Sequence, residues 1–137
     1  DRDATEFICK MFSVLHAWDD LVDQDKAVFP EEASQVFWFA LVDLPLNPFY
    51  QRFFAQLHPV LVNAILNWHA ATKLEREGGE KRQQIAFILR GAYIDLLSMA
   101  AFLVGGHAWA AQTIPAIRLW AHKETFPEYL TNLQIEQ

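Results

Sequence analysis

Three observations in the sequence predict an all-α fold. Apolar residues recur at spacings of three and four along several segments, which is the pattern of helices with one buried face. Prolines and pairs of glycines separate these segments at short intervals. Signals for β-strands are nearly absent, because there is no Asn-Gly or Asp-Gly turn and no sustained apolar–polar alternation. We therefore expect a single helical bundle of five to six helices, one domain over residues 1–137.

The first two helices are expected in the N-terminal third of the chain. An apolar stripe places the first helix from about Asp3 to Asp25, and it consists of Phe7, Met11, Val14, Leu15, Trp18, Leu21 and Val22. Pro30 breaks the chain, and a second helix is expected from Glu31 to about Asp43, with acidic residues in its first turn as the helix dipole favours. Asn47 followed by Pro48 is typical of an N-cap before a proline at the first helical position.

Three longer helices and a short one are expected in the rest of the chain. The longer helices are predicted at about 49–76, 80–104 and 108–123, with the first two ended by Gly78-Gly79 and Gly105-Gly106. Pro59 is expected to break or kink the first of these helices, and Pro115 to interrupt the last. Thr125 can cap a short final helix.

Composition and charge restrict the class of protein. With 53% hydrophobic and 20% charged residues, the chain is too apolar for disorder and long enough to bury a continuous core. A formal net charge of −6 argues against a nucleic-acid partner, because phosphate binding needs clustered Lys and Arg. Arg90 and Asp95 interrupt the most apolar run, residues 85–104, which favours a buried core helix over a membrane span.

Cysteine content and the first residues bear on the chemistry and the compartment. Cys9 is the only cysteine, which excludes an internal disulfide and a cysteine-based zinc cluster. The charged residues 1–6 carry no signal-peptide pattern, so we expect a cytoplasmic protein.

An acidic cluster on the first helix is the most unusual feature of the sequence. At 100° per residue, Asp19, Asp20 and Asp23 share one third of the helix circumference, with His16 on the same face one turn earlier. Carboxylates one turn apart repel each other unless a cation lies between them, and Mg²⁺ prefers oxygen ligands such as carboxylates and phosphates. The spacing favours a Mg²⁺ site that holds a diphosphate. The alternative is a solvated acidic helix face.

A second candidate lies on the helix expected at 80–104. Asp95 belongs to a segment that is apolar on nearly every side, and a buried carboxylate needs a metal, a cation or a hydrogen-bond donor as its partner. Arg90 and Arg118 are candidate cations, and a structural ion pair is the alternative to a metal site. The polar residues expected to contact a substrate are His16, Arg90, Tyr93, Ser98 and Arg118.

The segment from His16 to Asp25 (HAWDDLVDQD) resembles the aspartate-rich DDxxD motif of the class I isoprenoid (terpenoid) synthases. The resemblance implies a terpenoid-synthase-like bundle in which Asp19, Asp20 and Asp23 bind Mg²⁺ ions that hold an allylic diphosphate. The segment from Ile94 to Phe102 resembles the family's second metal motif, NDxxSxxxE, at Asp95 and Ser98. Ile94 and Phe102 replace its Asn and Glu, and the chain is shorter than the family's catalytic domains.

Three functions remain open from the sequence. The leading hypothesis is Mg²⁺-dependent binding or turnover of an isoprenoid diphosphate in an apolar pocket, which is transferase or lyase chemistry. A second is an all-α nucleoside triphosphate pyrophosphohydrolase, with paired motifs at Asp20 and Asp23 and at Asp95 and Ser98. The third is a non-catalytic helical interaction or assembly module, with a homo-oligomer as one form, because exposed Trp and Phe would fit a partner interface.

Overall fold

A computed structural model describes residues 1–23 and 27–136, and helices account for most of them, with no β-strand in these two ranges. The all-α helical bundle predicted from the sequence is confirmed. The chain divides into two compact units, Asp1–Leu57 and His58–Gln137, and each is described by itself. The single domain expected over residues 1–137 stays a prediction.

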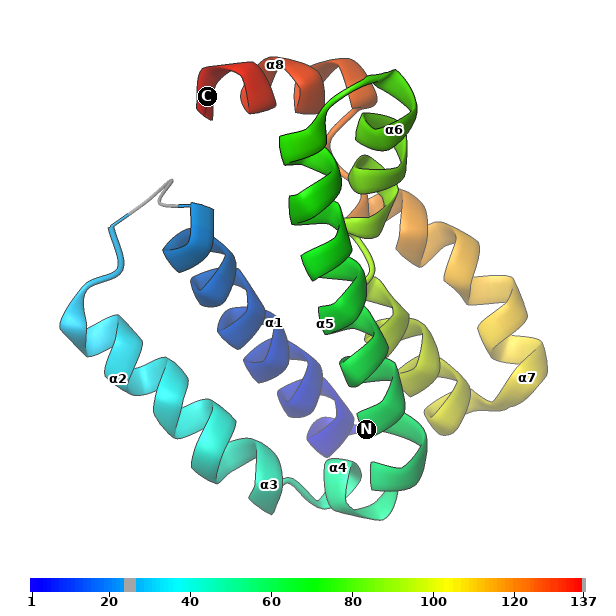
Figure 1. The fold of residues 1–137 in the computed structure, drawn as a ribbon. Coiled ribbons are helices and arrows are strands. Elements are labelled where there is room, and N and C mark those ends of the chain that lie inside the picture. Colours follow the sequence, from blue (N-terminus) through cyan, green and yellow to red (C-terminus); the bar gives the residue numbers. More distant parts are fainter. Residues whose placement is uncertain (24–26, 137) are drawn as a thin grey trace. The chain divides into compact units, whose positions relative to one another are not determined.

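The first unit contains α1 and the short helices that pack on it (Figure 1). Its elements are α1 (Arg2–Asp23), α2 (Pro30–Trp38), the π-helix η1 (Phe39–Asp43), α3 (Leu44–Leu46), α4 (Pro48–Arg52) and the start of α5 (Phe54–Glu77). Phe7 of α1 is fully buried and stacks on Tyr50, with ring centroids 5.0 Å apart. This aromatic contact joins α1 to α4 and forms the centre of the unit's core.

The second predicted helix is longer than expected. It begins at Pro30, changes to π-helical geometry at Phe39 and continues to Leu46 as α3. The Leu44 amide donates to the Phe39 carbonyl, five residues back, which is the hydrogen bond that defines a π-turn. The predicted cap is confirmed, because the Asn47 side chain accepts a hydrogen bond from the Tyr50 amide at 3.0 Å.

The break expected near Pro59 falls at Phe53 instead. Phe53 leaves helical geometry with φ −110° and ψ 25°, which separates α4 from α5. Pro59 lies inside α5, close to its start, where a missing amide removes a single intrahelical hydrogen bond and the helix continues. Gly78 and Gly79 end α5 as predicted, with φ values of 75° and 95° that favour glycine.

The second unit contains the rest of α5 together with α6 (Glu80–Leu89), α7 (Ile94–Ala121) and α8 (Phe126–Glu136). The single helix predicted at 80–104 is wrong, because the chain turns between α6 and α7. The Gly91 and Ala92 amides donate to carbonyls three residues back, at 3.1 and 3.0 Å. A Cβ on Gly91 would lie 2.4 Å from the His122 ring, so the turn holds a tertiary contact that only glycine permits.

The element α7 is a hairpin of two helical segments, the α7 hairpin, which turns at Gly106 (Figure 1). Gly106 has φ 82° and ψ 176°, so the glycine pair stops the first segment as predicted. Pro115 lies inside the second segment, which runs to Ala121, so the interruption expected there is wrong. Thr125 caps α8 as predicted: its hydroxyl accepts from the Glu128 amide at 3.3 Å.

Candidate functional site

The acidic cluster lies on the last two turns of α1, in the first unit. Asp19, Asp20 and Asp23 are half-buried, whereas His16 is exposed and its ring meets the Phe12 ring edge-on. Asp25, the last residue of the segment, lies outside the described residues. Within residues 1–23 and 27–136, no group of three or more His, Cys, Asp or Glu side chains is arranged to hold a metal ion. The Mg²⁺ site therefore stays a prediction.

Asp95 belongs to the second unit and forms an ion pair with Arg118. Arg118 Nη2 donates to Asp95 Oδ1, which joins the first segment of the α7 hairpin to the second. The Asp95 side chain is 40% exposed and the Arg118 side chain 33% exposed, so Asp95 is half-exposed rather than buried. Of the candidate partners for Asp95, the structure brings Arg118 to it.

Arg90 lies in a more buried polar cluster of the second unit. Its Nε donates to Glu75, which is 9% exposed, and its guanidinium lies 5.2 Å from the centroid of the Trp68 ring. Burial, and then the Glu75 carboxylate, raise the pKa of Tyr129. Both Glu75 and Trp68 lie in α5, so Arg90 joins the end of α6 to α5.

The remaining candidates, Ser98 and Tyr93, belong to the second unit. The Ser98 hydroxyl is buried and has no hydrogen-bond partner among the described residues. Tyr93 precedes α7 directly and is half-buried. The predicted residues thus belong to α1 in the first unit and to residues 90–118 in the second.

Glu75 is the main residue that sequence reasoning missed in the second unit. The residue stands in a charged stretch near the end of α5, which is typical of a solvated surface. Ala64, Ala71 and Glu75 nevertheless follow one buried stripe of α5 at helical spacing. The position of Glu75 on this stripe was the available signal for a buried carboxylate.

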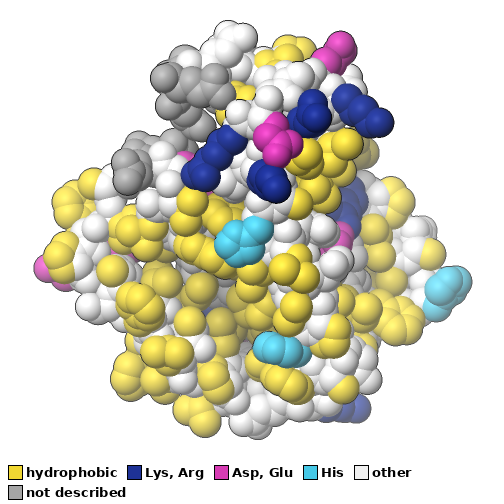
Figure 2. Space-filling model, viewed as in Figure 1, with side chains coloured by type: hydrophobic (Ala, Val, Ile, Leu, Met, Phe, Trp, Pro, Cys, Tyr) yellow, Lys and Arg dark blue, Asp and Glu magenta, His cyan; other side chains and the backbone are white. Residues whose placement is uncertain are grey.

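The first unit also carries an apolar surface, the α2–η1 patch, which consists of Phe37, Trp38 and Leu41. These side chains are 64%, 59% and 72% exposed, although all three are large and apolar. In a helix they share one face, since the residues lie one and four positions apart. Figure 2 shows hydrophobic side chains over much of the surface where Figure 1 places α2.

Polar contacts hold the α2–η1 patch in place. Trp38 Nε1 donates to Asp43 Oδ1 at 3.1 Å, and Lys10 Nζ of α1 donates to Asp43 Oδ2 at 3.0 Å. Lys10 Nζ also lies 5.3 Å from the centroid of the Phe39 ring. The indole N–H of Trp38 is satisfied within the unit, so an apolar ring of fixed orientation faces the solvent.

The sequence contained a signal for this surface. Residues 36–42 are seven consecutive apolar positions in one helix, and a helix that packs on one side cannot bury all of them. The surface offers apolar area beside one positive and one negative group, which suits binding rather than bond-making chemistry.

No protein-family model matches the chain, and no curated protein or solved structure matches it significantly.

Proposed function

We propose that the protein is a helical assembly module that forms homo-oligomers through the α2–η1 patch. The observation that carries the proposal is the pre-oriented, exposed Trp38 ring beside two further large apolar side chains, those of Phe37 and Leu41. Isolated exposed hydrophobic residues are normal on protein surfaces, but a contiguous apolar group points to an interaction site. Tryptophan is also enriched among the residues that dominate interface energies.

Pre-organisation supports this role for the patch. Ordering a flexible side chain at an interface costs about 0.5–1.5 kcal/mol, and the hydrogen bond to Asp43 reduces that cost for Trp38. The π-turn of η1 lies in the same segment, and such turns are frequent at functional sites.

The charges beside the patch support a second copy as the partner. Lys10 and Asp43 present one positive and one negative group, and their side chains are 33% and 25% exposed. In a two-fold symmetric dimer the same surface meets itself, so a patch flanked by both charges can be self-complementary.

The proposal is tested by light scattering on size-separated protein over a range of concentrations. Leu41→Ser removes an apolar side chain that is 72% exposed, and Leu66→Ser on α5 is a matched control at 60% exposure. Both variants should fold, because neither leaves a cavity in a core. Wild type and Leu66→Ser should associate, and Leu41→Ser should remain monomeric. Equal masses for the two variants would refute the proposal.

The second candidate function is Mg²⁺-dependent binding of a diphosphate, with isoprenoid-synthase-type chemistry as its enzymatic form. The observation that favours it is three half-buried aspartates on one face of α1. A divalent cation would relieve the repulsion among Asp19, Asp20 and Asp23, and it would accept phosphate oxygens as further ligands. The pyrophosphohydrolase hypothesis needs the same cation, so one binding experiment examines both.

A further inference from the structure

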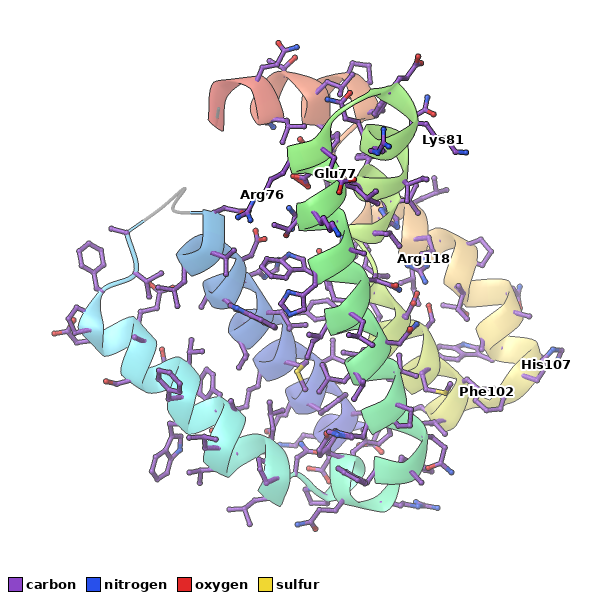
Figure 3. All side chains as sticks on the ribbon, viewed as in Figure 1. Arg76, Glu77, Lys81, Phe102, His107 and Arg118 are labelled. Atoms are coloured by element: carbon purple, nitrogen blue, oxygen red, sulfur yellow. The ribbon has the colours of Figure 1, made fainter. Side chains whose placement is uncertain are left out.

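The α7 hairpin has an uneven distribution of charge along its length. No Asp, Glu, Lys or Arg stands between Asp95 and Arg118, and these two residues pair with each other near the open end. The closed end carries exposed apolar side chains: Phe102, Val104 and Trp109 are 46%, 47% and 47% exposed. Figure 3 shows Phe102 and His107 at this closed end, away from Arg118.

We propose that the closed end of the α7 hairpin, residues 102–109, inserts shallowly into one leaflet of a lipid membrane. At a rise of 1.5 Å per residue, Asp95 lies about 16 Å along the helix from Gly106. Interfacial helices bury their apolar face about 5–10 Å deep, so the ion pair stays outside the apolar layer. The charged groups of the hairpin are thus confined to its open end, on the aqueous side of such a leaflet.

The arrangement of the apolar side chains favours lipid over a protein groove. Phe102 and Val104 come from the first segment and Trp109 from the second, so both sides of the turn are apolar. A protein groove covers one face of a hairpin, whereas lipid surrounds its end. Tryptophan is also enriched at the level of the lipid headgroups.

Close packing at the turn makes this end compact. A Cβ on Gly105 would lie 2.1 Å from Trp109 Cε3, so the indole ring covers the Gly105 backbone. By length and composition alone, one helical stretch within residues 80–134 could cross a membrane, and 33% of its most apolar window is buried. Shallow insertion needs only the closed end of the hairpin, so it does not require a span.

The test uses an environment-sensitive fluorophore on a single cysteine and vesicles of neutral phosphatidylcholine. Anionic lipid would repel a chain with a net charge of −6, whereas neutral lipid has no net charge, so binding to it reports insertion of apolar side chains alone. The test protein carries Cys9→Ser and Val104→Cys, which places the label at the closed end. The matched control is wild-type protein labelled at Cys9, which is exposed on α1.

The label at position 104 should shift to shorter wavelength when vesicles are added, and the label at Cys9 should not. Adding Phe102→Asp should weaken vesicle binding about tenfold or more, because a charge enters the apolar layer. Binding to the vesicles is measured by flotation in a density gradient. Three results would overturn the proposal: no flotation of the protein with the vesicles, equal wavelength shifts of the two labels, or a shift at position 104 that follows protein concentration without lipid. The last result would assign this surface to a protein contact.

Discussion

Replacing Glu75 by glutamine should cost far more stability than replacing Asp95 by asparagine. Both substitutions remove the carboxylate from an arginine ion pair of the second unit with little change in side-chain volume. The pairs differ in burial: the Arg90 and Glu75 side chains are 19% and 10% exposed, whereas Arg118 and Asp95 are 33% and 40% exposed. The comparison therefore isolates the cost of leaving a guanidinium without its counter-charge in a dry environment.

The magnitudes follow from the solvent exposure of each pair. Removing one partner of a buried pair costs about 3–5 kcal/mol, and we expect about 3 kcal/mol for Glu75→Gln because Arg90 keeps some contact with solvent. An exposed pair contributes about 0–1 kcal/mol, so Asp95→Asn should fall in that range. Replacing both members of the buried pair, with Glu75→Leu and Arg90→Met, should recover most of the loss, because no unpaired charge remains.

The assay is urea unfolding at pH 7, followed by far-ultraviolet circular dichroism. The midpoints should shift without a change in the denaturant dependence, which would show that the variants expose similar surface on unfolding. Equal losses for Glu75→Gln and Asp95→Asn would refute the argument from burial. A double replacement less stable than Glu75→Gln alone would show that the pair itself, rather than an uncompensated charge, supplies the stability.

Three further predictions concern pH, capping and metal binding. The pKa of Tyr129 is raised above its ordinary value of 10.0, so the unfolded state loses this proton at a lower pH than the folded state does. The free energy of unfolding should therefore fall as pH rises above 10.0. In Tyr129→Phe it should fall more gently, because this proton is absent. A titration in which Tyr129→Phe follows the wild type would contradict this. Asn47→Ala should lower the free energy of unfolding by about 1–2 kcal/mol, since it removes a buried N-cap; a loss no larger than that of an exposed polar residue such as Gln51→Ala would count against it. If the acidic face binds Mg²⁺ and diphosphate, the two together should raise the melting temperature, with about 2.7 kcal/mol of stabilisation at a ligand concentration 100 times the dissociation constant. The double replacement of Asp19→Asn and Asp23→Asn should abolish this shift. No shift in wild type at millimolar metal would contradict the metal site.

Local signals predicted the fold well. Asn47 and Thr125 form the helix caps that were expected of their side chains. The glycine pairs end helices because glycine, without a Cβ, adopts a positive φ at little steric cost. These features depend on a few adjacent residues. A single sequence contains what is needed to find them.

Tertiary contacts decided what the sequence could not predict. In the turn before α7 the His122 ring lies against Gly91, and these residues are far apart in the chain. Asp95 was expected to be buried because its neighbours are apolar, yet its half-exposed position and its pairing with Arg118 follow from how the α7 hairpin closes. Glu75 shows the reverse, since a charged neighbourhood concealed a buried carboxylate.

Self-association through the α2–η1 patch is tested most directly by sedimentation equilibrium of wild type against Leu41→Ser. Burying one large apolar side chain contributes about 1.5–3 kcal/mol, and a two-fold interface contains Leu41 twice. We expect a dissociation constant at least about 100-fold weaker for Leu41→Ser than for wild type, since each 1.4 kcal/mol is tenfold. A wild type that stays monomeric, or equal constants for the two proteins, would contradict it.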